Sequence, residues 1–163
     1  MDTETTTILL SVIILFLLLF CSALISGAEV ALFSLTKSQI DSFDNEDIKS
    51  TKTISNLLKS PKKLLATILV ANNFINIGVV ILFASLTEKI YGNYLIKLNF
   101  YNYKFNIDIT FLIEVFVITF LILLFGEILP KVYANRNNIK FSKFMAQPLK
   151  ILDIIFSPIS IHM

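Results

Sequence analysis

The sequence is poor in charged residues, in cysteine and in histidine, and each shortage excludes a class of protein. Charged side chains make up 16% of the 163 residues, whereas soluble domains have about 25%, so an ordinary soluble domain is excluded. The single cysteine, Cys21, rules out an intrachain disulfide. Since His162 is the one histidine, the chain also lacks a soft-ligand site for zinc or copper. The net charge of +2 is too small to indicate a nucleic-acid partner.

Long hydrophobic runs dominate what is present. Apolar residues account for 55% of the chain and gather in three blocks. A bilayer span needs roughly 20 apolar residues, or about 17–25 with tilt. We therefore predict an all-α integral membrane protein with three transmembrane helices, at about 8–33, 64–86 and 108–133. The first block is not a signal peptide, because the residues before it carry acids and no base.

The basic residues are distributed unevenly between the loops. Of the 14, six lie in 33–63, between the first two spans, and five follow the third apolar block. Three lie between the second and third spans, and none precedes the first. Cytoplasmic loops carry the excess of lysine and arginine. We therefore predict a multi-pass protein of the cell's inner (plasma) membrane, with its N-terminus outside and its C-terminus cytoplasmic.

Two further helices are predicted on the cytoplasmic side. Apolar residues recur with helical spacing in 138–160 and, more weakly, in 36–58. These patterns predict amphipathic juxtamembrane helices that lie along the membrane surface or pack under the bundle. Pro148 is expected to break the second of them, because proline lacks the backbone N–H that a helix interior needs.

Polar residues fall at one depth in the three predicted spans. Counted from the cytoplasmic ends at 1.5 Å per residue, Ser26, Asn72 and Glu127 all lie roughly 10 Å inside the boundary. Ser22 shares a helix face with Ser26, and Asn76 shares one with Asn72, because each pair is four residues apart. Such side chains are costly when they face lipid, so we expect them to turn inward and find partners.

The third span ends in an unusual group of residues, Gly126, Glu127 and Pro130. Pro130 has no N–H to bond the carbonyl of Gly126, four residues earlier, and glycine leaves room for a close approach. We expect a locally broken helix that presents this carbonyl beside the Glu127 carboxylate. Together with serine and asparagine oxygens, they form an all-oxygen set that suits a hard cation, Mg²⁺, Ca²⁺ or Na⁺.

Each of these features also has a simpler explanation. Small polar residues in spans often serve only in packing and interhelical hydrogen bonds. Glu127 could form a helix salt bridge with Lys131, four residues on, and Glu29 could be a charge near the lipid headgroups. The salt bridge explains neither Gly126 nor Pro130, so we favour the cation site.

Three segments resemble a known family: SGAEVALFSL at 26–35, ANNFIN at 71–76 and FGEILPKVYANR at 125–136. They are similar to the membrane domain of the CorC family, the bacterial relatives of the cyclin M (CNNM) magnesium transporters. The resemblance covers essentially the whole chain, 1–163, as a single domain. It implies a homodimer that exports Mg²⁺, driven by Na⁺ entry. Carried onto matching positions, it implies Mg²⁺ ligands at Ser22, Ser26, Asn72, Asn76, Gly126 and Glu127.

Members of this family usually continue into a paired cytoplasmic CBS module that binds ATP, and these 163 residues contain none. The alternative function is therefore a non-transporting membrane anchor or scaffold, for such a module or for another membrane complex. A mere anchor needs no matched layer of polar residues, which favours transport. An enzyme is the least favoured class, because the sequence has no nucleophile–base pair and no cofactor motif.

Overall fold

The computed structural model describes residues 3–42, 48–91 and 109–160, and this part of the chain is helical apart from short connections. Three helical rods are long and apolar enough to cross a membrane, which confirms the predicted all-α class and the three spans. The first rod is α1 (Thr3–Phe33) and the second is α4 (Pro61–Tyr91). The third is continuous through α5 (Ile109–Leu121), η1 (Ile122–Ile128) and α6 (Leu129–Arg136).

The third rod contains a π-helix where the sequence predicts a broken helix. The backbone N–H of Leu129 donates to the carbonyl of Leu124, five residues earlier, so η1 is wider than an α-helix. Pro130 stands at the start of α6, directly after this wide segment. The predicted break in the helix is therefore wrong. The helix is continuous, and the turns before Pro130 are widened into a π-helix. Short π-helical segments are rare and occur frequently at functional sites.

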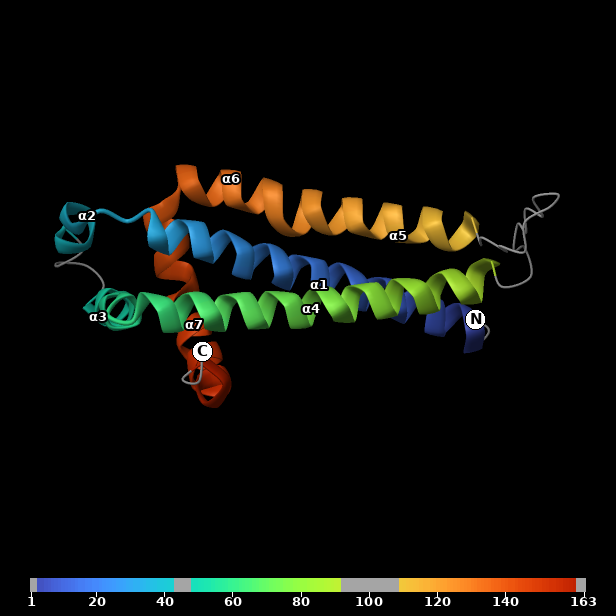
Figure 1. Ribbon diagram of the computed structural model, residues 1–163, viewed down its shortest axis with the longest axis horizontal. Coiled ribbons are helices and arrows are strands. Elements are labelled where there is room, and N and C mark those ends of the chain that lie inside the picture. The colour runs from blue at the N-terminus through green and yellow to red at the C-terminus, as the bar shows by residue number, and fades with distance from the viewer. Residues whose placement is uncertain (1–2, 43–47, 92–108, 161–163) are drawn as a thin grey trace, which may run out of the picture.

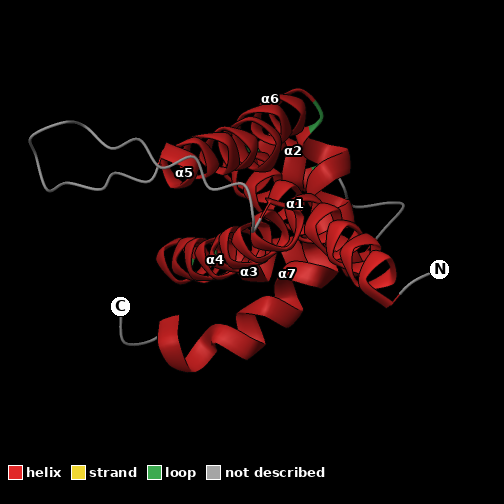
Figure 2. Cartoon of the chain, turned by 90° about the vertical axis from the view of Figure 1, so that its right-hand side faces the viewer, coloured by secondary structure: helices red, strands yellow, loops and turns green. Residues whose placement is uncertain are grey.

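Helix α1 is the centre of the bundle, with α4 along one side and the third rod along the other (Figures 1 and 2). Its buried face carries a run of small residues, which lets the neighbouring helices approach closely. These are Ser22, Ser26, Gly27, Ala28 and Ala31.

The helices outside the three rods gather at one end of the bundle (Figure 1). Two short helices, α2 (Lys37–Asp41) and α3 (Ile48–Leu58), lie there, and residues 43–47 between them fall outside the described residues. The long α7 (Asn138–Ser160) crosses the same end of the three rods. The break predicted at Pro148 is wrong, since α7 runs through it. Pro148 has no backbone N–H to donate to the carbonyl of Phe144, four residues earlier. Both residues lie on the exposed face of α7, so the missing hydrogen bond faces away from the bundle.

An apolar cluster fastens α7 to the rods. Buried residues of α7 pack with buried residues of α1, α3 and α4. A second cluster joins the other halves of α1 and α4 to the third rod. Ile75 of α4 packs against both clusters, so the two apolar clusters meet near the middle of α4.

Gly27 makes one of the tightest contacts in this arrangement. A Cβ atom at this position would lie 2.8 Å from the Phe141 ring of α7 and 3.3 Å from the carbonyl oxygen of Pro130. Gly78 differs, because the nearest atom to a Cβ there would be Leu18 Cδ1 at 3.6 Å, an ordinary van der Waals distance.

Replacing Gly27 with alanine is expected to destabilise the protein. Overpacking costs about 1–3 kcal/mol, which exceeds the gain of at most about 1 kcal/mol from removing a helical glycine. We expect the unfolding midpoint in detergent, followed by circular dichroism, to fall by a few degrees. The matched control is Gly78→Ala, which should leave the midpoint unchanged or raise it. Equal midpoints for the two variants would contradict the close crossing at Gly27.

Candidate cation site

Ser22 of α1 is the centre of a cluster of oxygen atoms. Its side chain is fully buried, at 0% exposure. The Oγ atom lies 2.9 Å from Asn72 Oδ1 and 2.8 Å from Asn76 Oδ1, both on α4. The structure thus brings together three of the residues predicted for the site, because serine and the two asparagines face each other across the α1–α4 contact.

The cluster can present oxygen ligands from two helices. The Ser22 hydroxyl has one proton, so it can donate to only one of the two amide oxygens at a time. Either amide can also turn its NH2 group towards the hydroxyl and donate to it, so rotation of one asparagine side chain satisfies the hydrogen bonds of the cluster. With both amide oxygens turned towards Ser22, the three oxygens can coordinate one cation together.

Gly126 brings the third rod to the same hydroxyl. Gly126 is buried in η1, and a Cβ atom there would lie 3.1 Å from Ser22 Oγ. The absence of a side chain is what allows η1 to approach the cluster. The Gly126 backbone is therefore adjacent to the oxygen group formed by Ser22, Asn72 and Asn76.

Ser26 and Glu127 are less closely tied to this group. Ser26, one turn along α1 from Ser22, is buried at 1% exposure, and its Oγ has no hydrogen-bond partner within the described residues. Glu127 follows Gly126 in η1 and is half-buried. Within the described part of the chain it forms no hydrogen bond or ion pair. Within the described residues, both side chains therefore have unused oxygen ligands, Ser26 one turn from Ser22 and Glu127 next to Gly126 in the chain.

The predicted alternative for Glu127, a salt bridge with Lys131, is wrong. Lys131 Nζ instead lies 3.3 Å from a carboxylate oxygen of Glu29 on α1. The reason is the tight packing of α1 on α6, which places the Glu29 carboxylate within reach. Among the described residues, this pair leaves Glu127 without a cationic partner, and it gives Glu29 a role in joining two rods.

The oxygen cluster lies between two apolar layers. Ser22 stands on α1 between Leu19, in one hydrophobic cluster, and Ile25, in the other. Likewise, Asn72 and Asn76 follow Ala71 of one cluster and precede Val79 of the other. Exclusion of water by such layers lowers the effective dielectric constant, so a charge bound here would interact strongly with the oxygens around it.

The ligand chemistry of the site is neutral oxygen with one carboxylate nearby. Across the residues that the structure describes, no group of three or more histidine, cysteine, aspartate or glutamate side chains could hold a metal. What the three rods can supply is hydroxyl, amide and backbone oxygen, with charge from Glu127. These ligands suit hard cations rather than zinc or copper.

Taken together, the fold and the oxygen cluster define a multi-pass membrane protein with a polar site between its spans. The chain belongs to the family described as the cyclin M transmembrane N-terminal domain, whose model matches residues 13–163. This confirms the family resemblance read from the three sequence segments.

Several bacterial proteins are similar to the chain. A UPF0053 protein of Haemophilus influenzae is 32% identical over 147 residues, which cover 90% of this chain and 31% of that protein. The UPF0053 inner membrane protein YfjD of Escherichia coli is 30% identical over 134 residues, or 80% of this chain and 28% of that protein. A UPF0053 protein of Mycoplasma genitalium is 32% identical, over 98% of this chain and 36% of that protein. The chain thus spans about a third of the length of the curated relatives that it matches.

Proposed function

We propose that this domain binds Mg²⁺ between its three spans and exports it across the membrane, coupled to Na⁺ entry. The observation that carries the proposal is the convergence of Ser22, Asn72 and Asn76, where the serine hydroxyl oxygen lies 2.9 and 2.8 Å from the two amide groups. Membership of the cyclin M family supports a transport role.

Mg²⁺ fits the ligands that surround this cluster. The ion dehydrates reluctantly and prefers six oxygen ligands. The hydroxyls, amide oxygens, a backbone carbonyl and the carboxylate would replace part of its water shell, and remaining waters would complete it. The proposed ligands are Ser22, Ser26, Asn72, Asn76, Gly126 and Glu127. Because only Glu127 is charged, the bound ion keeps a net positive charge, which favours release on the far side.

The surroundings of the domain form part of the same proposal. We place the N-terminus outside and the C-terminus in the cytoplasm, from the lysine and arginine distribution. The printed name of the E. coli relative includes "inner membrane", and we propose the same location here. The relatives are about three times as long as the chain, so a cytoplasmic CBS module is proposed as a partner, with a homodimer as the assembly.

Binding of Mg²⁺ to the purified chain tests this function, with Asn72→Ala as the variant. Isothermal titration in detergent should give saturable Mg²⁺ binding to the parent. Loss of one oxygen ligand should weaken the binding at least about fivefold, or about 1 kcal/mol. The control is Asn73→Ala, the same substitution at the adjacent position, where the side chain is exposed. It should bind like the parent.

Flux measurements then separate transport from mere binding. In proteoliposomes, Mg²⁺ movement should depend on an opposing Na⁺ gradient and should be slowed by Asn72→Ala, not by Asn73→Ala. Binding without flux would favour a scaffold whose cation is structural. Absence of binding in every protein would contradict the cation site and favour the membrane-anchor function.

A further inference from the structure

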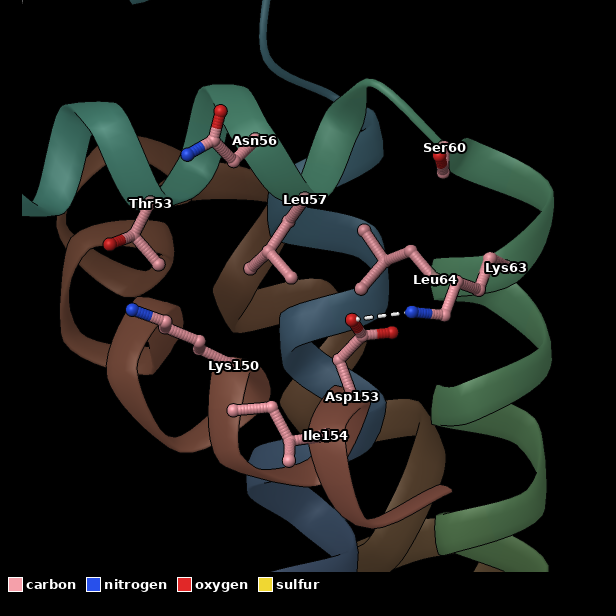
Figure 3. A pocket seen from close by; sticks show the side chains of 9 residues that line it. All are labelled: Thr53, Asn56, Leu57, Ser60, Lys63, Leu64, Lys150, Asp153 and Ile154. Atoms are coloured by element: carbon pink, nitrogen blue, oxygen red, sulfur yellow. Dashed lines mark hydrogen bonds and ion pairs between the residues drawn. The ribbon is translucent and has the colours of Figure 1, made fainter. Parts of the chain in front are cut away.

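A pocket with both polar and apolar lining residues lies where α3, α4 and α7 meet, at the end of the bundle that holds α2, α3 and α7 (Figures 1 and 3). Its volume is about 250 Å³, which is enough for a phosphate group. The pocket is separate from the oxygen cluster at Ser22, since none of that cluster's residues line it.

Two lysines and one aspartate line the pocket, and the aspartate forms an ion pair with one of the two lysines. Lys63 Nζ of α4 lies 2.9 Å from Asp153 Oδ2 of α7, and the fully buried Thr67 donates to Asp153 Oδ1 at 3.3 Å. Both oxygens of the carboxylate are therefore engaged with α4. The aspartate holds the two helices together, and its negative charge is offset by Lys63.

Lys150 is the cation that remains. It extends from α7 beneath α3 towards Thr53, across the pocket from the Lys63–Asp153 pair (Figure 3). It forms no ion pair within the described residues. Two lysines against one aspartate give the lining side chains a net positive charge.

Neutral donors complete the lining. The Asn56 Oδ1 atom accepts from Lys59 Nζ at 3.0 Å, so the amide oxygen is used and the amide nitrogen keeps its two protons to donate. Ser60, in the turn between α3 and α4, adds a hydroxyl. Phosphate oxygens accept hydrogen bonds from cationic and neutral donors. Here both kinds of donor surround a space large enough for a phosphate group.

We propose that this pocket binds a phosphate group, carried by a membrane lipid or free in solution. The pocket opens at the first turn of α4, where that span starts, so it lies at the level expected for lipid headgroups. Basic pockets at the ends of transmembrane helices bind anionic headgroups. A phosphate there would contact Lys150 and compete with Asp153 for Lys63, which links the ligand to the contact between α4 and α7.

Three substitutions test the site through opposite expected effects. Lys150→Gln should weaken phosphate binding at least about fivefold, because it removes the unpaired cation. Asp153→Asn should strengthen binding, because it frees Lys63 and removes the repelling carboxylate. Lys140→Gln is the matched control, since Lys140 is an exposed lysine of the same helix that does not line the pocket. It should bind like the parent.

Titration with different ligands distinguishes free phosphate from the phosphate of a lipid headgroup. The delipidated chain in detergent is titrated with inorganic phosphate by calorimetry, and with phosphatidylglycerol or phosphate-free diacylglycerol by native mass spectrometry. Saturable phosphate binding that follows the variants would identify a site for free phosphate. Binding of phosphatidylglycerol alone, in the same order of variants, would identify a lipid site. Binding of neither, or equal losses in Lys150→Gln and Lys140→Gln, would overturn the proposal, whatever the result at the Mg²⁺ site.

Discussion

Glu127→Gln is expected to weaken Mg²⁺ binding to the purified chain at least about tenfold, or about 1.4 kcal/mol. The substitution keeps the shape of the side chain and removes the negative charge of the residue that follows Gly126 in η1. Two unit charges about 4 Å apart interact with about 4 kcal/mol at an effective dielectric constant near 20, so a fraction of this energy suffices for the effect. Isothermal titration measures the binding, and proteoliposome flux should fall with it.

The matched control for this variant is Glu114→Gln. Glu114 lies on α5, in the same rod as Glu127, and is also half-buried. If overall negative charge in the third span attracts the cation, both variants should lose affinity equally. If the carboxylate acts at the cluster, only Glu127→Gln should lose it. A Glu127→Gln protein that binds and moves Mg²⁺ like the parent would contradict the assignment of Glu127 as a ligand.

The pairing of Glu29 with Lys131 strengthens this expectation. Had Lys131 been bound to Glu127, the carboxylate would have been neutralised within its own helix. Instead the lysine reaches α1, at 3.3 Å from Glu29, and Glu127 keeps its charge available to a ligand. The salt bridge therefore joins two rods on the side of the site where α6 begins.

The oxygen cluster could be predicted from the sequence because its members follow helix periodicity. In a membrane the backbone hydrogen bonds must be satisfied internally, so a long apolar run is a helix and its faces can be read directly. Ser22 with Ser26, and Asn72 with Asn76, each share a face at a spacing of four residues. The cost of turning these groups to lipid then requires that the faces meet.

Contacts that depend on tilt and rotation of the helices could not be predicted in this way. The ion pairs Glu29–Lys131 and Lys63–Asp153 join residues that are far apart in sequence, and no periodicity identifies their partners. The same is true of Gly27 against Phe141. The π-helical conformation of the third rod could not be predicted either. Pro130 removes a hydrogen bond, but this does not specify whether the helix breaks or widens into a π-helix.

Gly126→Ala is expected to lower Mg²⁺ affinity about tenfold without changing any charge or polar side chain. The new methyl group would lie 3.1 Å from Ser22 Oγ, so the hydroxyl must shift away from Asn72 or Asn76 and the ligand geometry is lost. Isothermal titration measures this effect, and Gly78→Ala, with 3.6 Å to its nearest neighbour, serves as the control with unchanged affinity.

The double variant Ser22→Ala/Gly126→Ala separates crowding from ligand loss. Removing Oγ relieves the close contact, so the unfolding midpoint should rise above that of Gly126→Ala alone. Mg²⁺ affinity should stay low, because the double variant lacks the hydroxyl that gathers the two amide oxygens. Parent-like affinity in Gly126→Ala would mean that the cation does not bind where η1 approaches Ser22. Recovered affinity in the double variant would mean that Ser22 is a packing residue, and that the asparagines and Glu127 bind the cation without it.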